Sequence, residues 1–224
     1  MPTKIISNNT TGVGTGDYSG TPDVKIRLAA PTTNYDGFGN VEVSKWAAGD
    51  HTHGLFTFAG LSNITGPVVV SSITLGIYQE SATGTYAIDV RRVLRNWVEA
   101  EATWNNYSTA GGAWTTAGCL SDGNDRVGAT SGQFASFGTG VGFVTVTQTS
   151  GGLVDDVQGW INGTFSNYGW HLMRSDAGED ATSKVFTSTL GTDGNKCYLS
   201  VTYTTGTDTV IAGFGRRLRG FIYS

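Results

Sequence analysis

WVEAEATWNN, residues 97–106, places two tryptophans seven positions apart around two glutamates. Side chains alternate between faces in an extended strand, so this stretch would put Trp97, Glu99, Glu101 and Thr103 on one face. The two glutamate Cα atoms would then lie about 6.5–7 Å apart. Glycosidases use carboxyl separations of about 5–9.5 Å. The spacing therefore raises the hypothesis of a catalytic carboxylate pair.

An acid–base pair needs one buried carboxyl with a raised pKa and a second carboxyl that stays ionised. Glu99 and Glu101 share one face with only short neighbours, which predicts similar pKa values. The alternative is that Glu99 accepts a hydrogen bond from the backbone or from Thr103, while Trp97 or Trp104 packs in the core. We favour this structural interpretation.

Composition points to a turn-rich β-protein with a real core. The chain has 224 residues, 38% of them hydrophobic and only 14% charged, and it contains 33 glycines. An average chain is about 25% charged and about 7% glycine. The net charge of −4 and the scattered basic residues argue against nucleic-acid binding. The sequence contains no apolar run of about 18 residues, so no membrane span is predicted. Residues 1–20 lack the apolar segment of a secretory signal.

Alternating and apolar segments predict about nine or ten strands. Val24, Ile26 and Leu28 alternate with Lys25 and Arg27, which indicates a half-buried strand. The other predicted strands are 41–45, 55–58, 68–80, 86–90, 141–147, 170–173, 185–190 and 197–203. Residues 107–140 show no periodicity.

One helix is predicted over residues 151–163, where apolar residues recur at helical spacing. Many strands, turn residues between them and one short helix favour an all-β, jelly-roll β-sandwich. We place an N-terminal arm at 1–22, the sandwich domain at 23–204 and a C-terminal tail at 205–224.

The tail is the predicted partner-binding segment, because it mixes apolar side chains with three arginines. Contiguous apolar surface of this kind marks an interaction site or an aggregation risk, and packing on its own domain is the alternative. The residues assigned to partner contact are Phe214, Arg216, Arg217, Leu218, Arg219, Phe221 and Tyr223.

Several segments, in this order, resemble the DNRLRE-domain family, which overlaps a group of carbohydrate-binding modules. They are GLFTFAGLSNI (54–64), VVVSSITLGIY (68–78), WVEAEATWNN (97–106), VDDVQGWING followed by NYGWHL (154–172), VFTSTL (185–190) and CYLSVTY (197–203). The resemblance implies a jelly-roll domain without catalytic residues, found on surface proteins, on polysaccharide-processing enzymes and among phage structural proteins. The chain departs from the family in lacking its eponymous hexapeptide and in carrying His51, Thr52 and His53 where a basic residue often stands.

Metal and cofactor signals are weak. His51 and His53 would share a strand face, but no third zinc ligand is identifiable, so we interpret them as ordinary surface or loop histidines. Residues 122–125 (DGND) and 175–180 (SDAGED) could offer oxygen ligands to a structural calcium ion, although neither has the spaced ligands of an EF-hand. We therefore expect no cofactor and no metal. Two cysteines, Cys119 and Cys197, could pair, but nothing else indicates secretion, and free thiols are favoured.

Aromatic residues in the long polar segment could stack on sugar rings if their faces are exposed. We assign Tyr107, Trp114 and Phe134 to this potential glycan contact, with burial of a loop-anchoring ring as the alternative. No nucleophile elbow, phosphate loop or Cys/His metal signature is present.

We therefore expect a non-enzymatic structural or adhesion protein of a phage virion, such as a capsid decoration, head-fibre or tail protein. Its partners would be other virion proteins or its own copies. The alternative is an extracellular or cell-surface carbohydrate-binding module that recognises a polysaccharide.

Overall fold

The alternating residues after Asp23 form a strand, as the sequence predicts. Val24 and Ile26 are buried, whereas Lys25 and Arg27 on the other face are only half-buried. The computed structural model describes residues 1–8, 16–17, 19–46, 49–176, 182–188, 190 and 195–205.

Most of the described elements are strands. In chain order they are β1 (Thr3–Ser7), β2 (Asp23–Arg27), β3 (Asn40–Trp46), β4 (Asp50–Phe56), the 3-10 helix η1 (Ala59–Asn63), β5 (Val68–Ala82), β6 (Tyr86–Arg92), β7 (Asn106–Ser108), β8 (Gly112–Ala113), β9 (Gly132–Phe137), β10 (Gly142–Gln148), α1 (Gly152–Ile161), β11 (Trp170–Arg174), β12 (Thr182–Thr187) and β13 (Tyr198–Thr205). The predicted all-β sandwich with one short helix is confirmed.

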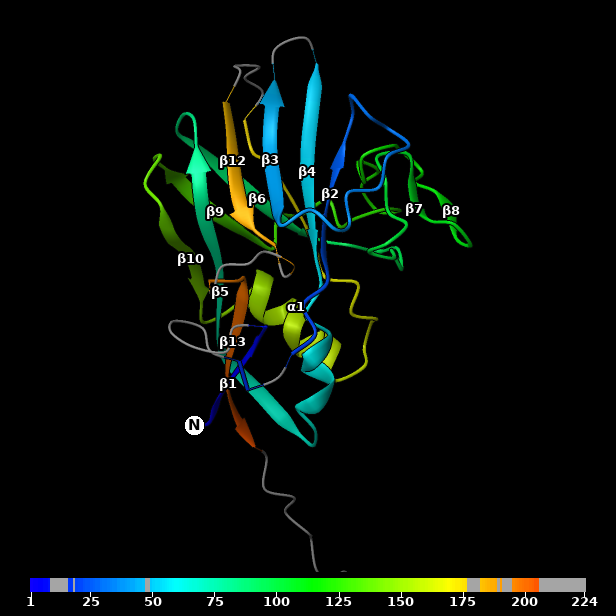
Figure 1. The fold of residues 1–224 in the computed structure, drawn as a ribbon. Coiled ribbons are helices and arrows are strands. Elements are labelled where there is room, and N and C mark those ends of the chain that lie inside the picture. The colour runs from blue at the N-terminus through cyan, green and yellow to red at the C-terminus, as the bar shows by residue number, and fades with distance from the viewer. Residues whose placement is uncertain are drawn as a thin grey trace, which may run out of the picture.

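The main sheet is antiparallel and curls around the core. Its strand order is β1-β13-β5-β12-β3-β4-β11-β6-β9, with β10 paired to β5 and β2 paired to β4. The long strand β5 pairs with β13 along its first part and with β12 at its end. Figure 1 shows β12, β3, β4 and β2 side by side on one face, and α1 at the centre of the molecule below them.

Helix α1 packs its apolar stripe into the main core, as the sequence predicted. Leu153, Val157 and Trp160 are buried, and the Trp160 ring lies 4.7 Å from the Trp170 ring between centroids. The Trp170 indole N–H donates to Asp156 at 2.8 Å, so a carboxylate on the helix satisfies a buried donor on β11.

A second, smaller core lies on the outer side of β2 and β4. Neighbouring β4 residues divide between the cores, since Phe56 belongs to the main core and Leu55 to the second one. Trp97, Trp104 and Trp114 supply the aromatic part of the second core. Because both faces of this part of the sheet are covered, the segment 54–56 is apolar without alternation.

The predicted N-terminal arm, residues 1–22, is wrong for Thr3–Ser7. These residues form β1, which pairs with β13 along its whole length, and Ile6 is fully buried in the main core. The edge of β1 is closed by Asp17, whose backbone N–H donates to Ile5 O and whose carboxylate accepts the Ile5 N–H.

The long segment 107–140 contains more structure than its composition suggests. Strands β7, β8 and β9 all fall within it or begin just before it. β9 joins the main sheet by pairing with β6, and β7 pairs with β8 as a separate hairpin.

A buried lysine joins β12 to the turn between β9 and β10. Lys184 is fully buried, and its ammonium donates to Phe137 O at 2.8 Å and to Gly138 O at 3.1 Å. It also contacts Gly84 O at 3.3 Å and Gln79 Oε1 at 3.5 Å. In the described part of the chain β9 and β10 share no ladder. Lys184 therefore connects β12 to the end of β9 and to the turn that follows it.

Candidate functional site

The stretch 97–106 is a turn rather than an extended strand. The backbone N–H groups of Glu101 and Ala102 both donate to Val98 O, at 3.0 and 2.7 Å. The common face that the catalytic hypothesis required is therefore not formed.

Both glutamates of this stretch accept hydrogen bonds from the backbone. Glu99 Oε1 accepts the Asp23 N–H at 2.8 Å and so connects the turn to the start of β2. Glu101 Oε2 accepts the Thr109 N–H at 2.6 Å. Desolvation raises the pKa of Glu99, and the hydrogen bond from Asp23 opposes that shift. The structural interpretation of Glu99 is the one that the contacts support.

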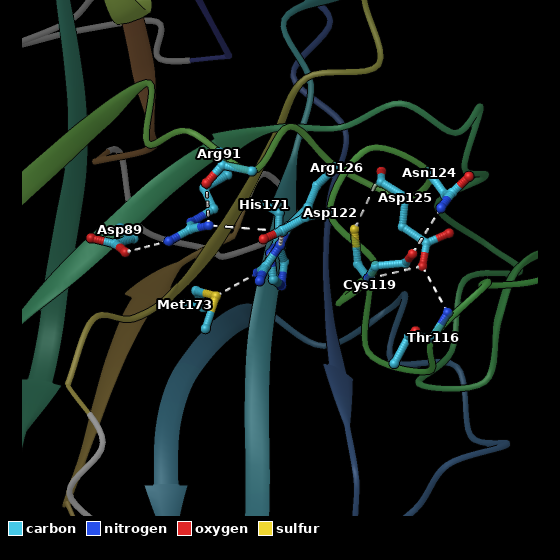
Figure 2. A network of polar contacts seen from close by, with 12 residues as sticks. Asp89, Arg91, Thr116, Cys119, Asp122, Asn124, Asp125, Arg126, His171 and Met173 are labelled. Atoms are coloured by element: carbon cyan, nitrogen blue, oxygen red, sulfur yellow. Dashed lines mark hydrogen bonds and ion pairs between the residues drawn. The ribbon is translucent and has the colours of Figure 1, made fainter.

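Asp125 organises the loop between β8 and β9 (Figure 2). Its side chain is fully buried and accepts backbone N–H groups from Thr115 and Thr116 at 2.9 Å and from Ser121 at 3.3 Å. The Arg95 guanidinium lies 3.5 Å away. In the segment proposed for calcium, this carboxylate is therefore already engaged by protein donors.

The same loop reaches the sheet through Arg126 (Figure 2). Arg126 Nε donates to Asp122 at 3.0 Å, and its Nη1 contacts His171 Nδ1 on β11 at 3.1 Å. His171 Nε2 lies 3.0 Å from His53 Nδ1 on β4. Burial lowers the pKa of His53 to about 3 and lowers that of His171 well below its usual value. Two neutral imidazoles thus bridge loop and sheet.

The interpretation of the two histidines as surface or loop residues is wrong for His53, which is buried within β4 and packs against Trp104. His51 is half-buried, with its ring 6.3 Å from that of His53. Among the described residues, no group of three or more His, Cys, Asp or Glu side chains is placed to hold a metal ion. Cys119 and Cys197 are both buried and free.

Two of the three aromatic rings assigned to glycan contact are buried. Trp114 is 4% exposed in the second core, and Phe134 is fully buried in the main core. Their predicted exposure is wrong, because each ring anchors the polar segment that carries it. Tyr107 is half-buried and remains partly open to solvent.

Tyr107 lines an open groove of about 560 Å³, here called the tyrosine groove. Its lining consists of Leu94, Arg95, Asn96, Val98, Glu101, Tyr107, Ser108, Ala110, Gly111 and Tyr168. A smaller hollow of about 220 Å³ adjoins it and shares Asn96, Val98 and Tyr168. Val98 is 40% exposed and Asn96 is exposed. The groove thus combines two tyrosines with amide, carboxylate and guanidinium groups.

A second cavity, here called the helix-end groove, measures about 630 Å³. It lies between η1 with the residues after it and the C-terminal end of α1. Its lining consists of Ala59, Leu61, Ser62, Ile64, Thr65, Gly66, Trp160, Ile161, Asn162, Gly163 and Asn167. The lining contains no charged side chain.

The predicted partner-binding residues between Phe214 and Tyr223 lie outside the described residues, as does most of the second calcium candidate, 177–180. Asp176, at the start of that candidate, is paired with Arg174. No helix in the described ranges is long and apolar enough to cross a membrane.

Comparison of the chain with models of known protein families and with curated proteins found no match. The resemblance to the DNRLRE-domain family therefore stays a prediction.

Sequence reasoning missed both grooves as sites. Tyr168 is about 70 positions away in sequence from its spatial neighbours Asn96 and Val98, so no local pattern brings these residues together. The one available signal was the tyrosine within a turn, where an aromatic ring has few neighbours to bury it.

Proposed function

We propose that this chain is a non-enzymatic structural and adhesion protein, a phage virion component that attaches to neighbouring subunits through its tail, residues 205–224. Capsid decoration, head-fibre and tail proteins are the kinds of component that fit. The carboxylates of Glu99, Glu101 and Asp125 support the non-enzymatic part, because each of them accepts backbone N–H groups in a structural role.

One observation carries the attachment proposal, namely that both described ends of the chain lie at one end of the molecule. The Tyr203 N–H donates to Pro2 O at 3.1 Å, and β13 ends at Thr205 opposite Val68. Figure 1 shows the β7–β8 hairpin far from the N-terminus. An anchor that begins after Thr205 would therefore leave the tyrosine groove, beside that hairpin, facing away from the attachment point.

The test has two parts, location and attachment. Immunogold electron microscopy of native material should place this chain on virion particles, and labelling of free protein alone would reject the virion assignment. Deleting residues 206–224 should abolish incorporation while leaving the circular dichroism spectrum and thermal unfolding unchanged, because the core residues of the described part of the chain all precede this segment. Replacing Thr207 and Thr209 by alanine is a matched control that should incorporate normally.

A second candidate function is carbohydrate binding in the tyrosine groove. Sugar sites combine an apolar platform with a few directed polar groups. Tyr107 and Tyr168 could supply the platform, and Arg95, Asn96 and Glu101 the polar groups. We expect binding on an array of cell-wall and capsular polysaccharides that Tyr107→Ala and Tyr168→Ala each weaken about tenfold or more. Tyr78→Ala, at a half-buried tyrosine on β5, is the control. Binding that is absent at high protein concentration, or indifferent to both substitutions, would reject this function.

A further inference from the structure

The helix-end groove lies beside the point where the described chain ends. Thr205, the last residue of β13, is paired with Val68. Val68 follows Gly66, which lines the groove, by only two positions. The tail therefore begins next to this groove rather than at a distant part of the surface.

The groove has a mixed lining without charged side chains, and it contains an uncompensated helix end. Its apolar part consists of Leu61, Ile64, Trp160 and Ile161, of which the first three are only 3–8% exposed. Its polar part includes the exposed residues Ser62, Thr65 and Asn162. Helix α1 ends at Ile161 with Asn162 as its C-cap, and its last turn contains no basic residue. Since a helix C-terminus carries a partial negative charge that favours cations, the groove suits a segment that carries both apolar side chains and positive charge.

The tail has this composition. Residues 210–223, VIAGFGRRLRGFIY, carry apolar side chains before and after a cluster of three arginines. The spacer between Thr205 and this segment is 206–209, which can extend by about 13 Å. That length brings the tail of an adjacent copy within range when two molecules meet at this end.

We propose that the helix-end groove binds the C-terminal tail of a second copy of this chain. Apolar side chains such as Phe214 would cover Leu61 and Trp160, and the arginines would lie near the end of α1. Because the groove and the tail exit share one end of the molecule, two copies can exchange tails reciprocally. A two-fold dimer follows, in which both interfaces are the same. This inference rests on the proposed function of the tail in attachment.

The first test measures the mass of the full-length chain by light scattering during size-exclusion chromatography over a range of concentrations. Wild type should dimerise. Thr65→Arg with Asn162→Arg places two cations on exposed positions of the groove and should weaken dimerisation about thirtyfold or more. Thr145→Arg with Asn124→Arg makes the same charge change at exposed positions elsewhere and should leave dimerisation unchanged. Thermal unfolding checks that all variants fold.

Mixing identifies the occupant of the groove. A tail variant, Phe214→Asp with Phe221→Asp, should be monomeric, as should the groove variant. An equimolar mixture should form a 1:1 heterodimer, because one intact groove then meets one intact tail. A wild-type monomer at all concentrations, which includes the case of a tail docked on its own domain, would overturn the inference. A groove variant that dimerises like wild type would overturn it too.

The incorporation assay separates this inference from the proposed function. If deletion of 206–224 abolishes incorporation but the groove variant incorporates and dimerises normally, attachment by the tail stands and the groove assignment fails. If the deletion leaves incorporation intact, the proposed function itself fails.

Discussion

Replacing Lys184 by methionine should destabilise the fold by an amount that grows with pH above neutrality. The wild-type ammonium is fully buried and donates to the backbone oxygens of Gly84, Phe137 and Gly138 and to the side-chain oxygen of Gln79, with no carboxylate among these acceptors. The rings of Tyr86 and Phe137 lie 4.8 and 3.9 Å from Nζ. Methionine has a side chain of similar length but carries no hydrogen-bond donor.

At pH 7 we expect the substitution to lower the free energy of unfolding by about 2–4 kcal/mol, because several buried acceptors lose their partner. Gly138 lies in an exposed turn, where water can replace part of the loss. The expected loss of unfolding free energy is therefore smaller than the summed contributions of the individual hydrogen bonds.

The pH dependence follows from the lysine pKa. Burial, with a smaller contribution from Arg174, lowers the pKa of Lys184 to about 8, whereas the unfolded chain keeps a value of about 10.4. Between these values the folded state has released its proton and the unfolded state still binds one. The free energy of unfolding of the wild type therefore increases as pH rises through that window, and this pH-dependent gain is absent below about pH 8.

At about 1.4 kcal/mol per pH unit the full window corresponds to about 3 kcal/mol. Solvent near the exposed turn and the carbonyl oxygens both favour the ammonium, so we expect about 1–2 kcal/mol. The buried thiols of Cys119 and Cys197 act in the opposite direction, because burial raises the pKa of each in the folded state. The difference between wild type and variant cancels their contribution.

The assay is urea unfolding of both proteins at pH 7.0, 8.5 and 9.5, with a reducing agent present. The penalty of Lys184→Met should be about 1–2 kcal/mol larger at pH 9.5 than at pH 7.0. A penalty that stays constant, or that shrinks as pH rises, would refute the assigned environment of this lysine.

Three further substitutions test other parts of the structure. Trp104→Ala should cost about 3–5 kcal/mol in urea unfolding, since it removes a ring of the second core; a cost below 1 kcal/mol would contradict that core. Asp125→Ala should leave three backbone N–H groups without their acceptor, so amide exchange at Thr115, Thr116 and Ser121 should accelerate while exchange in β5 does not; uniform acceleration would instead indicate global destabilisation. Glu99→Gln keeps the acceptor for Asp23 N–H and removes a half-buried charge whose pKa burial raises. Since a raised folded-state pKa means stability is lost as pH rises through it, the variant should be at least as stable as wild type at pH 7, and a clear loss in thermal unfolding would contradict this.

Long apolar or alternating segments carried most of the predictable fold. The elements β2, β5, β10 and α1 form where the sequence indicates them. Burial of one face of a strand or helix requires apolar residues at a regular spacing, and that spacing is visible in the sequence. β4 was predicted only from Leu55 onward, since His53 and Thr52 are polar although both are buried. Their burial depends on partners such as His171 that lie far away in sequence, so no local pattern could reveal it.

The missed strands are those whose stability comes from a neighbour rather than from their own residues. β1 has only Ile5 and Ile6 as apolar residues in its centre and exists by pairing with β13. The turn at 98–102 was not predicted either. Trp97, Glu99 and Glu101 alternate as they would in the extended strand that the catalytic hypothesis requires, but the backbone N–H groups of Glu101 and Ala102 both donate to Val98 O.

The second core explains why a chain with so few charged residues concentrates carboxylates near its tryptophans. A long segment without regular structure has backbone N–H groups that no neighbouring strand accepts. Where such a segment is buried, these N–H groups need another hydrogen-bond acceptor. Trp97, Trp104 and Trp114 bury the segment against β2 and β4. Glu99 and Asp125 then accept the N–H groups that no strand partner satisfies. Burial of this segment by the tryptophans therefore requires the carboxylates as hydrogen-bond acceptors. A catalytic use of Glu99 would remove an acceptor on which this packing depends.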